Sequence, residues 1–354
     1  MLRRGLTIVA VTSPRLETLL LFDERMIEHD PGPGHVERSD RLRAIEAVLS
    51  LRSLTNSRIE PARAATEEEI ARVHSLDHIA RVGELAGQYG SLDPDTHVSP
   101  DSVRAAVLAA GAAARGIDAL CTGVAANAFA LVRPPGHHAV AGRGMGFCLF
   151  NNIAIAAAHA RAVYGKQRIV VIDWDVHHGN GTESIFYDTD SVLFISVHQA
   201  PLYPGTGEAR VSGAGAGIGH TVNVPLQAGA GNGDYARVFR EIVLPIAESY
   251  GPDLVLVSAG FDAHRDDPLG GMEVTEDGFA TLCGQVRDFA RHSACPLMLS
   301  LEGGYDLAAL ARSVHACIDV LTGDAPPTAD VRSSSRAESD LRTVLARQRE
   351  FWPV

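Results

Sequence analysis

Short, largely apolar runs recur along the chain and alternate with longer stretches whose apolar residues are spaced as on one face of a helix. Runs of this kind are typical of strands that are buried on both faces of a parallel sheet. The predicted strands are residues 129–132, 169–172, 192–197, 254–257 and 297–301, and the predicted helices are residues 101–120, 152–163, 234–249, 276–291 and 307–321. This alternation predicts an α/β fold with a single open, mostly parallel sheet flanked by helices.

Cap and turn residues predict the limits of the elements and of the domain. Ser99 is a suitable N-cap for the first predicted helix, with Pro100 at its first position. The C-terminal stretch begins rich in Pro, Ala and Ser, which predicts a connector, and continues as a small helix over residues 337–351. We therefore predict one domain over residues 1–323, with the connector and helix of residues 324–354 docking on it.

Composition and charge restrict the class of protein. With 46% apolar residues the chain can bury a large core, and a net charge of −12 argues against nonspecific binding to nucleic acid. The five cysteines include no CxxC pair, so we expect a reducing cytoplasm, and the single lysine, Lys166, is typical of a GC-rich bacterial genome. The apolar run 6–11 after Arg3 and Arg4 is too short for a signal peptide, and no stretch approaches the roughly 18 apolar residues of a membrane span.

Chemically active side chains follow the predicted strands, at the points where those strands end. In an open α/β sheet, ligands bind at the carboxyl ends of the strands, so we expect these side chains to meet at one edge. They are His137, His138, Asp173, Asp175, His177, Asn180, His198, Asp262 and Tyr305. Their placement predicts a single active site at that edge of the sheet.

Three of these residues form a candidate metal site. Asp175 and His177 are two residues apart, so both side chains point the same way in an extended segment, and Asp262 from another strand end completes the set. Two carboxylates and a neutral imidazole balance the charge of Zn²⁺ and leave a position for water, whereas structural zinc sites usually have four ligands rich in Cys. Such an ion lowers the pKa of bound water towards roughly 7 and polarises a carbonyl group. The alternative is an ordinary turn at a strand end.

Other side chains at the same edge are suited to proton transfer. The tandem His137-His138 follows Pro-Pro-Gly and fits general acid and general base catalysis beside a metal, because imidazole titrates near neutral pH. Asp173 and Asn180 are candidate partners that would fix the histidine tautomers. Tyr305, behind two glycines, is a candidate donor to a developing oxyanion. Taken singly, loop histidines held by hydrogen bonds and a buried aromatic residue are the alternative interpretations.

The strings RPPGHH, GFCLFNN, DWDVHHGNGT, SAGFDA, DPLGG and EGGY occur in an order that resembles the histone deacetylase superfamily, in particular its class II-like members. The resemblance extends from about Phe22 to about Gly323. It implies an arginase-like fold of one domain, one Zn²⁺ per chain, a structural K⁺ or Na⁺, and removal of acetyl or other acyl groups from lysine side chains of proteins or peptides. The alternatives are deacetylation of acetylated polyamines and, more remotely, a non-catalytic acyl-lysine binding protein.

The resemblance also implies a role for each matching residue. The zinc ligands are Asp175, His177 and Asp262. The catalytic residues are His138 as general base and acid, His137 as its electrostatic partner, and Tyr305 as the oxyanion donor. The substrate-binding residues are Gly136, Phe147, Tyr203, Leu269 and Asp95. The residues behind the ligands or around a monovalent cation are Asp173, Asn180, Ser196 and Val197, with Asp175 and His177 again in contact with that cation.

Departures from the family pattern bear on substrate choice. Tyr203 stands where phenylalanine is common in the channel wall, which makes the channel more polar, and the surrounding loop 198–207 is short. Leu269 occupies the position of an acidic gatekeeper in polyamine-selective relatives, so we expect acyl-lysine peptides to be preferred over acetylated polyamines. His35-Val36 replaces His-Pro, a change that we expect to affect only the shape of a loop.

Further residues bear on competing functions and on partners. A binuclear manganese ureohydrolase, which shares the general fold, needs carboxylates that bridge two ions, but Gly179 and His264 stand at those positions. A binding module needs neither a general base nor an oxyanion donor. Arg41 and Arg133 either line an interior channel or pair locally. A homo-oligomer is compatible with the sequence, and we expect neither a nucleic-acid nor a membrane partner.

Overall fold

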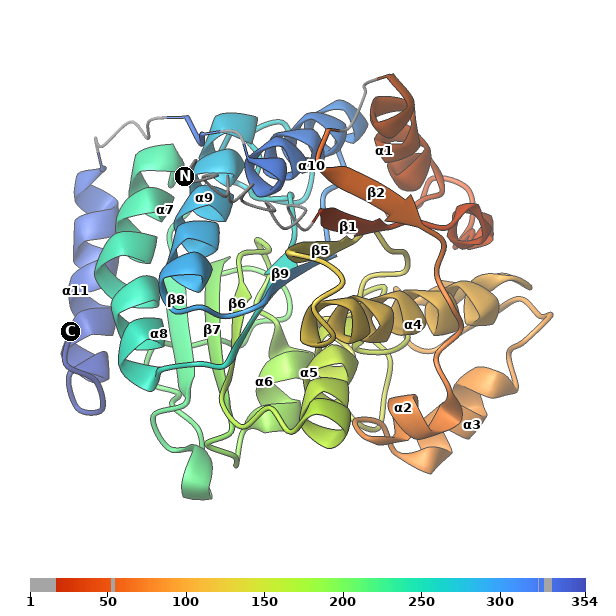
Figure 1. Ribbon diagram of the computed structural model, residues 1–354, viewed down its shortest axis with the longest axis horizontal. Coiled ribbons are helices and arrows are strands. Elements are labelled where there is room, and N and C mark those ends of the chain that lie inside the picture. The colour runs from red at the N-terminus through yellow and green to blue at the C-terminus, as the bar shows by residue number, and fades with distance from the viewer. Residues whose placement is uncertain (1–16, 52–54, 324, 328–332) are drawn as a thin grey trace, which may run out of the picture.

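The computed structural model describes residues 17–51, 55–323, 325–327 and 333–354 (Figure 1). The apolar run 6–11 and part of the predicted connector therefore lie outside the described residues. The strands are β1 (Thr18–Leu21), β2 (Ser57–Glu60), β3 (Gly90–Ser91), β4 (His97–Val98), β5 (Asn127–Ala130), β6 (Ile169–Asp173), β7 (Val192–Gln199), β8 (Thr221–Leu226), β9 (Leu254–Ala259) and β10 (Leu297–Leu301). The helices are α1 (Asp40–Leu51), α2 (Glu67–Ala71), α3 (Leu76–Gly83), α4 (Ser102–Cys121), α5 (Asn152–Tyr164), α6 (Asn180–Phe186), α7 (Asn232–Val238), α8 (Leu244–Tyr250), α9 (Glu276–His292), α10 (Leu307–Thr322) and α11 (Ser335–Gln348), with short helical segments η1 (Glu24–Glu28), η2 (Gly215–Gly217) and η3 (Phe239–Val243).

Among the described residues, eight strands form one parallel sheet in the order β2-β1-β5-β10-β9-β6-β7-β8, and β3 and β4 pair as a small antiparallel hairpin. The five predicted strands are the consecutive strands β5, β10, β9, β6 and β7. Their side chains are buried almost throughout, because Val-, Ile- and Leu-rich strands fit between two layers of helices. The predicted fold class, a single open and mostly parallel sheet flanked by helices, is confirmed.

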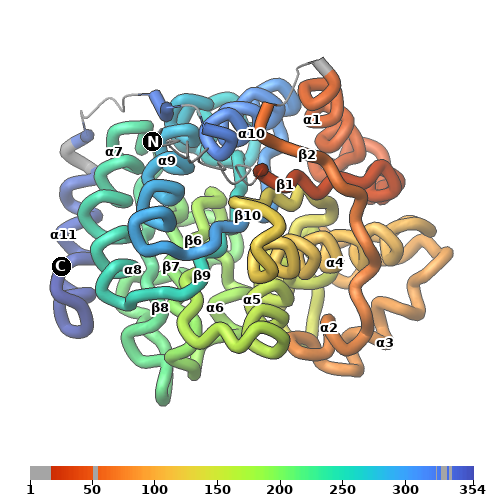
Figure 2. The backbone as a smooth tube through the Cα atoms, in the orientation of Figure 1, coloured from red at the N-terminus to blue at the C-terminus, as the bar shows by residue number. Residues whose placement is uncertain are grey.

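Helices cover both faces of the sheet (Figure 2). One face is covered by α4, α5 and α6, and the other by α1, α10, α9 and α7. In each of these two layers, every helix contacts the next one named. The C-terminal helix α11 packs against the edge strand β8. The division of the chain at residue 323 stays a prediction.

Several element boundaries differ from the prediction for local reasons. The helix α4 begins at Ser102, and Ser99 is not its N-cap; instead the Ser99 N–H donates to Ser102 Oγ at 2.7 Å. The predicted helix 234–249 comprises α7, a π-helical turn and α8, and Pro245, which has no N–H to donate, follows that turn. The strand β7 continues through His198, because His198 still lies in register with β8.

Candidate metal centre and active site

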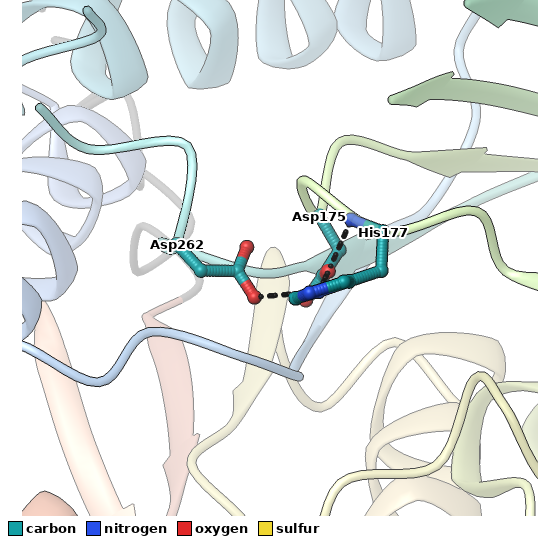
Figure 3. Close-up of side chains that lie close together, drawn as sticks. All are labelled: Asp175, His177 and Asp262. Atoms are coloured by element: carbon teal, nitrogen blue, oxygen red, sulfur yellow. Dashed lines mark hydrogen bonds and ion pairs between the residues drawn. The ribbon is translucent and has the colours of Figure 1, made fainter. Parts of the chain in front are cut away.

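Asp175, His177 and Asp262 converge beyond the carboxyl ends of β6 and β9 (Figure 3). The two carboxylates are fully buried and the imidazole is almost fully buried. His177 Nδ1 lies 3.0 Å from Asp175 Oδ1 and 3.2 Å from Asp262 Oδ2. Ligand atoms of all three residues lie within 4.8 Å of one another, so a single cation can contact all of them.

Backbone N–H groups hold one side of each carboxylate. Asp175 Oδ2 accepts a hydrogen bond from Gly303 N at 2.8 Å, and Asp262 Oδ1 accepts one from Val176 N at 2.8 Å. Asp262 Oδ2 is buried and accepts no hydrogen bond from the described residues, and its one charged neighbour is the His177 ring 3.2 Å away. A buried carboxylate oxygen that accepts no hydrogen bond is costly unless a cation neutralises it. The three residues therefore fit a divalent metal ion.

The pKa values of these residues reflect an excess of buried negative charge. Burial raises the pKa of Asp262 to about 7, and the neighbouring Asp175 carboxylate acts in the same direction. Burial opposes the charging of His177, but the carboxylates of Asp175 and Asp262 outweigh it and raise the pKa of His177 to about 10. Both shifts favour protonation, as expected where two carboxylates lie close together in a buried site.

Two glycines leave the space that the carboxylates occupy. A Cβ atom at Gly303 would overlap Asp262 Oδ2, and a Cβ atom at Gly260 would overlap Asp175 Oδ2. Gly303, in the motif that follows β10, is therefore required by close packing against the two carboxylates.

The tandem histidines have different partners. His137 Nδ1 lies 2.9 Å from Asp173 Oδ2, and His138 Nδ1 lies 2.8 Å from Asn180 Oδ1. Burial disfavours a charged His137, but Asp175 and Asp173 outweigh it and hold its pKa well above the usual range. Burial, together with the nearby His137 and His177, holds the pKa of His138 well below the usual range. The surroundings thus favour the charged form of His137 and the neutral form of His138.

The Glu302 carboxylate holds the backbone of the tandem histidines, a role that the sequence motifs did not predict. Its fully buried carboxylate accepts hydrogen bonds from Gly136 N at 2.6 Å, His137 N at 3.1 Å and Ser258 Oγ at 3.1 Å. Burial raises the pKa of Glu302 to about 7. Because Glu302 directly follows a predicted strand, the sequence placed it near the site. Its hydrogen-bond partners become visible only in the folded chain.

Tyr305 and His138 line a cavity of about 250 Å³. The residues around this cavity are Asp95, His138, Gly146, Phe147, His177, Leu202, Tyr203, Leu269 and Tyr305. Burial holds the pKa of Tyr305 well above its usual range, so its hydroxyl stays protonated and can donate. His177 brings the candidate metal centre to the same cavity.

Four of the five predicted substrate-binding residues line this cavity, namely Asp95, Phe147, Tyr203 and Leu269. Gly136 is not among the lining residues; a Cβ atom there would face Asn152 N at 2.5 Å. Its predicted place beside the channel stays a prediction. Gly146 and Leu202 also line the cavity, and the sequence pattern had not singled them out.

The sheet register brings the predicted cation residues together. Asp173 lies opposite Ser196 of β7 and opposite Ser258 of β9. Val197 is the next residue of β7 and is fully buried. Ser196 Oγ lies 2.9 Å from His198 Nδ1, so its side chain already has a polar neighbour.

Arg41 and Arg133 pair locally with Glu37, and all three side chains are fully buried. Arg41 also donates to the carbonyl oxygens of Gly304 at 2.6 Å and Glu302 at 2.5 Å, and its guanidinium lies 4.9 Å from the centre of the Tyr305 ring. The local pairing is thus the interpretation that the structure supports.

Residues 35–321 match the family described as the histone deacetylase domain. The chain belongs to this family. It is 42% identical to histone deacetylase 15 of Arabidopsis thaliana, over 97% of this chain and 64% of that protein. It is 38% identical to the histone deacetylase-like amidohydrolase of Pseudomonas aeruginosa, over 94% and 93%, and 40% identical to the polyamine deacetylase HDAC10 of Homo sapiens, over 95% and 53%.

A solved structure of the same family, the crystal structure of the HDA15 HD domain, matches with a TM-score of 0.89 and 41% identity over 96% of each chain. The family predicted from the motifs is therefore confirmed. The chain spans about two thirds of the length of the Arabidopsis relative, about half of the human relative and nearly all of the amidohydrolase. No helix in the described part of the chain combines the length and apolar character that a membrane crossing requires.

Proposed function

We propose that the protein is a zinc-dependent amidohydrolase that removes acetyl or other acyl groups from lysine side chains of proteins or peptides. The observation that carries the proposal is one cavity lined by a metal-ligand candidate, His177, a neutral imidazole, His138, and a phenol, Tyr305. Family membership supports the same class of reaction, since the relatives include proteins named as deacetylases and as an amidohydrolase.

Asp175, His177 and Asp262 would hold one Zn²⁺ per chain. When bound there, the ion supplies Lewis acidity that activates water and polarises the amide carbonyl. The described residues offer no ligand set for a second ion: Gly179 has no side chain to bind one, and His264 Nε2 lies 3.2 Å from Glu276. The grouped Asp173, Ser196 and Val197 favour a structural K⁺ or Na⁺ behind the site.

The protein's own groups divide the proton transfers. His138, whose burial keeps it neutral, can accept a proton from water and later donate one to the leaving amine. His137 pairs with the Asp173 carboxylate, which favours its charged form, and it would act on His138 electrostatically. Tyr305 lines the same cavity, and its hydroxyl would donate a hydrogen bond to the oxyanion.

The cavity walls favour an acyl-lysine peptide over an acetylated polyamine. Phe147, Tyr203 and Leu269 enclose an aliphatic stem, and Leu269 offers a distal ammonium no counter-charge. Asp95 is the carboxylate at this cavity, and it suits backbone N–H groups of a peptide. The relative named as a polyamine deacetylase makes acetylated polyamines the second candidate.

Metal analysis combined with a turnover panel tests the proposal. The purified chain should contain one Zn²⁺ and hydrolyse acetyl-lysine peptides with a higher kcat/KM than acetylated spermidine or putrescine. Asp262→Ala should lose both metal and activity, whereas Asp188→Ala, which removes an exposed carboxylate, should lose neither. Two tightly bound ions, or full metal content in Asp262→Ala, would contradict the mononuclear site. A tenfold preference for the polyamines would favour the second candidate.

A further inference from the structure

Thr96 lies just behind the cavity, in the turn between β3 and β4, and connects two of its lining residues. Its side chain is almost fully buried. The hydroxyl accepts a hydrogen bond from Phe147 N at 3.1 Å and donates one to Asp95 Oδ1 at 3.2 Å. One hydroxyl therefore joins an aromatic wall to the rim carboxylate.

Phe147 has a backbone conformation that needs support. Its φ angle is +69°, in the left-handed region that bulky residues rarely occupy. Residues persist there only where their surroundings hold them. The Phe147 N–H group that Thr96 binds belongs to this strained residue. The preceding Gly146 is also left-handed, and a Cβ atom there would face His138 Cδ2 at 2.5 Å.

His35 contacts the same two residues from another side. Its ring meets the Phe147 ring edge-on, with the ring centres 4.7 Å apart. His35 Nε2 lies 3.3 Å from the Asp95 carbonyl oxygen. Phe147 and Asp95 are thus connected twice, through Thr96 and through His35. The loop that carries His35 therefore reaches the wall of the cavity.

The turn itself does not require the Thr96 hydroxyl. The backbone of Thr96 closes the turn, since its N–H donates to Asp93 Oδ1 at 2.8 Å and its carbonyl accepts from Leu92 N at 2.9 Å. Within the described part of the chain, the Thr96 hydroxyl forms hydrogen bonds only with Phe147 N and Asp95 Oδ1. Its role can therefore be separated from the folding of the hairpin.

We infer that Thr96 is a positioning residue that fixes Phe147 and Asp95 as one unit, so that the aromatic wall and the rim carboxylate meet the substrate together. This inference rests on the proposed amidohydrolase function for its kinetic consequence. Thr96 does not line the cavity, so it acts through its two neighbours.

Steady-state kinetics with an acetyl-lysine peptide test the inference. Thr96→Val keeps the shape but removes the hydroxyl, and it should raise KM by about tenfold with kcat changed less than about threefold, the scale of one lost buried hydrogen bond. Thr96→Ser should restore a wild-type KM. The matched control is Thr18→Val, at the opposite end of the sheet, whose buried hydroxyl donates to Leu321 O at 3.2 Å; its KM should stay unchanged. A wild-type KM in Thr96→Val would overturn the inference.

A double-mutant cycle tests whether Thr96 acts through Asp95. Asp95→Asn and Thr96→Val should each raise KM, and the double variant should raise it by less than the product of the two single effects. Independent, multiplicative effects would contradict a shared unit. Thr96→Ala replaces Thr96→Val in the same cycle if the valine variant does not fold.

Hydrogen exchange gives a readout that does not depend on turnover. Loss of the acceptor for Phe147 N should accelerate exchange in the segment 143–149 in Thr96→Val, while Thr96→Ser and Thr18→Val keep the wild-type rate there. Unchanged exchange in this segment would show that Thr96 does not hold Phe147. If the wild-type chain hydrolyses no acyl amide but the exchange changes as expected, the proposed function fails while the positioning role stands.

Discussion

The oxygen atoms of the two ligand carboxylates differ in their hydrogen bonding, and this difference favours a metal over an ordinary turn. Asp262 Oδ1 accepts a hydrogen bond from a backbone N–H, whereas the buried Asp262 Oδ2 accepts none from the described residues and lies 3.2 Å from the His177 ring. The spacing of Asp175 and His177 predicts that both point the same way, but it cannot show which oxygens stay unpaired. That information depends on Val176 and Gly303, which approach only in the folded chain.

Substitution of Tyr305 tests the oxyanion donor. Tyr305→Phe should keep the metal and the KM but lower kcat by roughly 10²- to 10³-fold, the scale of one lost donor to an oxyanion. The matched control is Tyr250→Phe, which removes a largely buried hydroxyl that donates to Asp190 O at 2.9 Å, far from the cavity. Turnover by Tyr305→Phe at the wild-type rate would show that another group carries this role.

Substitution of Leu269 tests substrate choice. Leu269→Glu places a carboxylate in the cavity lining and should shift the kcat/KM ratio towards acetylated polyamines by roughly tenfold, because a charged hydrogen bond at a partly desolvated rim is worth about 1–3 kcal/mol. Leu76→Glu, which changes an exposed leucine on α3, is the control for added charge. Equal ratios in the two variants would remove Leu269 from the specificity determinants.

Residues with distinctive chemistry could be predicted individually, while those that act through packing could not. Histidine, aspartate and tyrosine after successive strands indicated the site, since parallel strands end at one edge. Gly146 has no side chain and Leu202 has a purely apolar one, so only their position in the cavity lining identifies them. Glu302 was visible in its motif, but its hydrogen bonds to the N–H groups of Gly136 and His137 require the tertiary fold.

At the scale of elements, the strand ends position the chemistry, and apolar runs found five of the six inner strands. The inner strand β1, with the buried sequence TLLL, was missed although it is itself an apolar run. The outer strands were missed for physical reasons. β2 has the sequence SRIE and lies at the sheet edge, where its side chains are partly exposed, so it lacks a continuous apolar run. β8 contains Asn223 and Pro225, which interrupt the pattern, and Pro is tolerated there because β8 is the other edge strand.

The turn that follows β10 is predicted to be essential for metal binding. Gly303→Ala should lower metal affinity by roughly 10- to 100-fold, because the added methyl group overlaps Asp262 Oδ2 and displaces a ligand. Gly83→Ala, at the end of α3, has nothing within 4 Å of the added atom and serves as the control. Calorimetric zinc titration measures both. Undiminished affinity in Gly303→Ala would mean that the turn can shift without moving Asp262.

At the scale of the whole molecule, a polar network joins helices on one face of the sheet. Glu69 of α2 pairs with Arg63 at 2.6 Å and lies 3.4 Å from His159 of α5, and His159 Nε2 lies 2.7 Å from Asp118 of α4. Burial opposes ionisation of Glu69, but Arg63 and the Thr66 N–H outweigh it and lower its pKa to about 2. The network therefore stabilises the fold only while Glu69 is ionised.

The pH dependence of stability tests this network. The folded pKa of Glu69 lies below its ordinary value of 4.5, so its contribution is complete above that pH and is lost as the pH falls towards about 2. Glu69→Gln should lower the free energy of unfolding by roughly 1–3 kcal/mol at neutral pH and flatten its decline below pH 4.5. Glu68→Gln, at an exposed neighbouring position, should do neither. Denaturant titrations across this pH range measure both variants, and parallel curves would contradict the role of Glu69.

The strand order has a consequence for how the chain matures during synthesis. Strand β5 pairs with β10, whose residues follow about half a chain length later, and β9 cannot be enclosed until β10 arrives. Contacts between such distant segments form slowly, because the entropy cost of closing a long loop must be met before the contacts contribute any stabilisation. A nascent chain lacks Gly303 until most of the protein has left the ribosome. Zinc capture would accordingly mark the last stage of folding, and stalled chains of increasing length would acquire it abruptly.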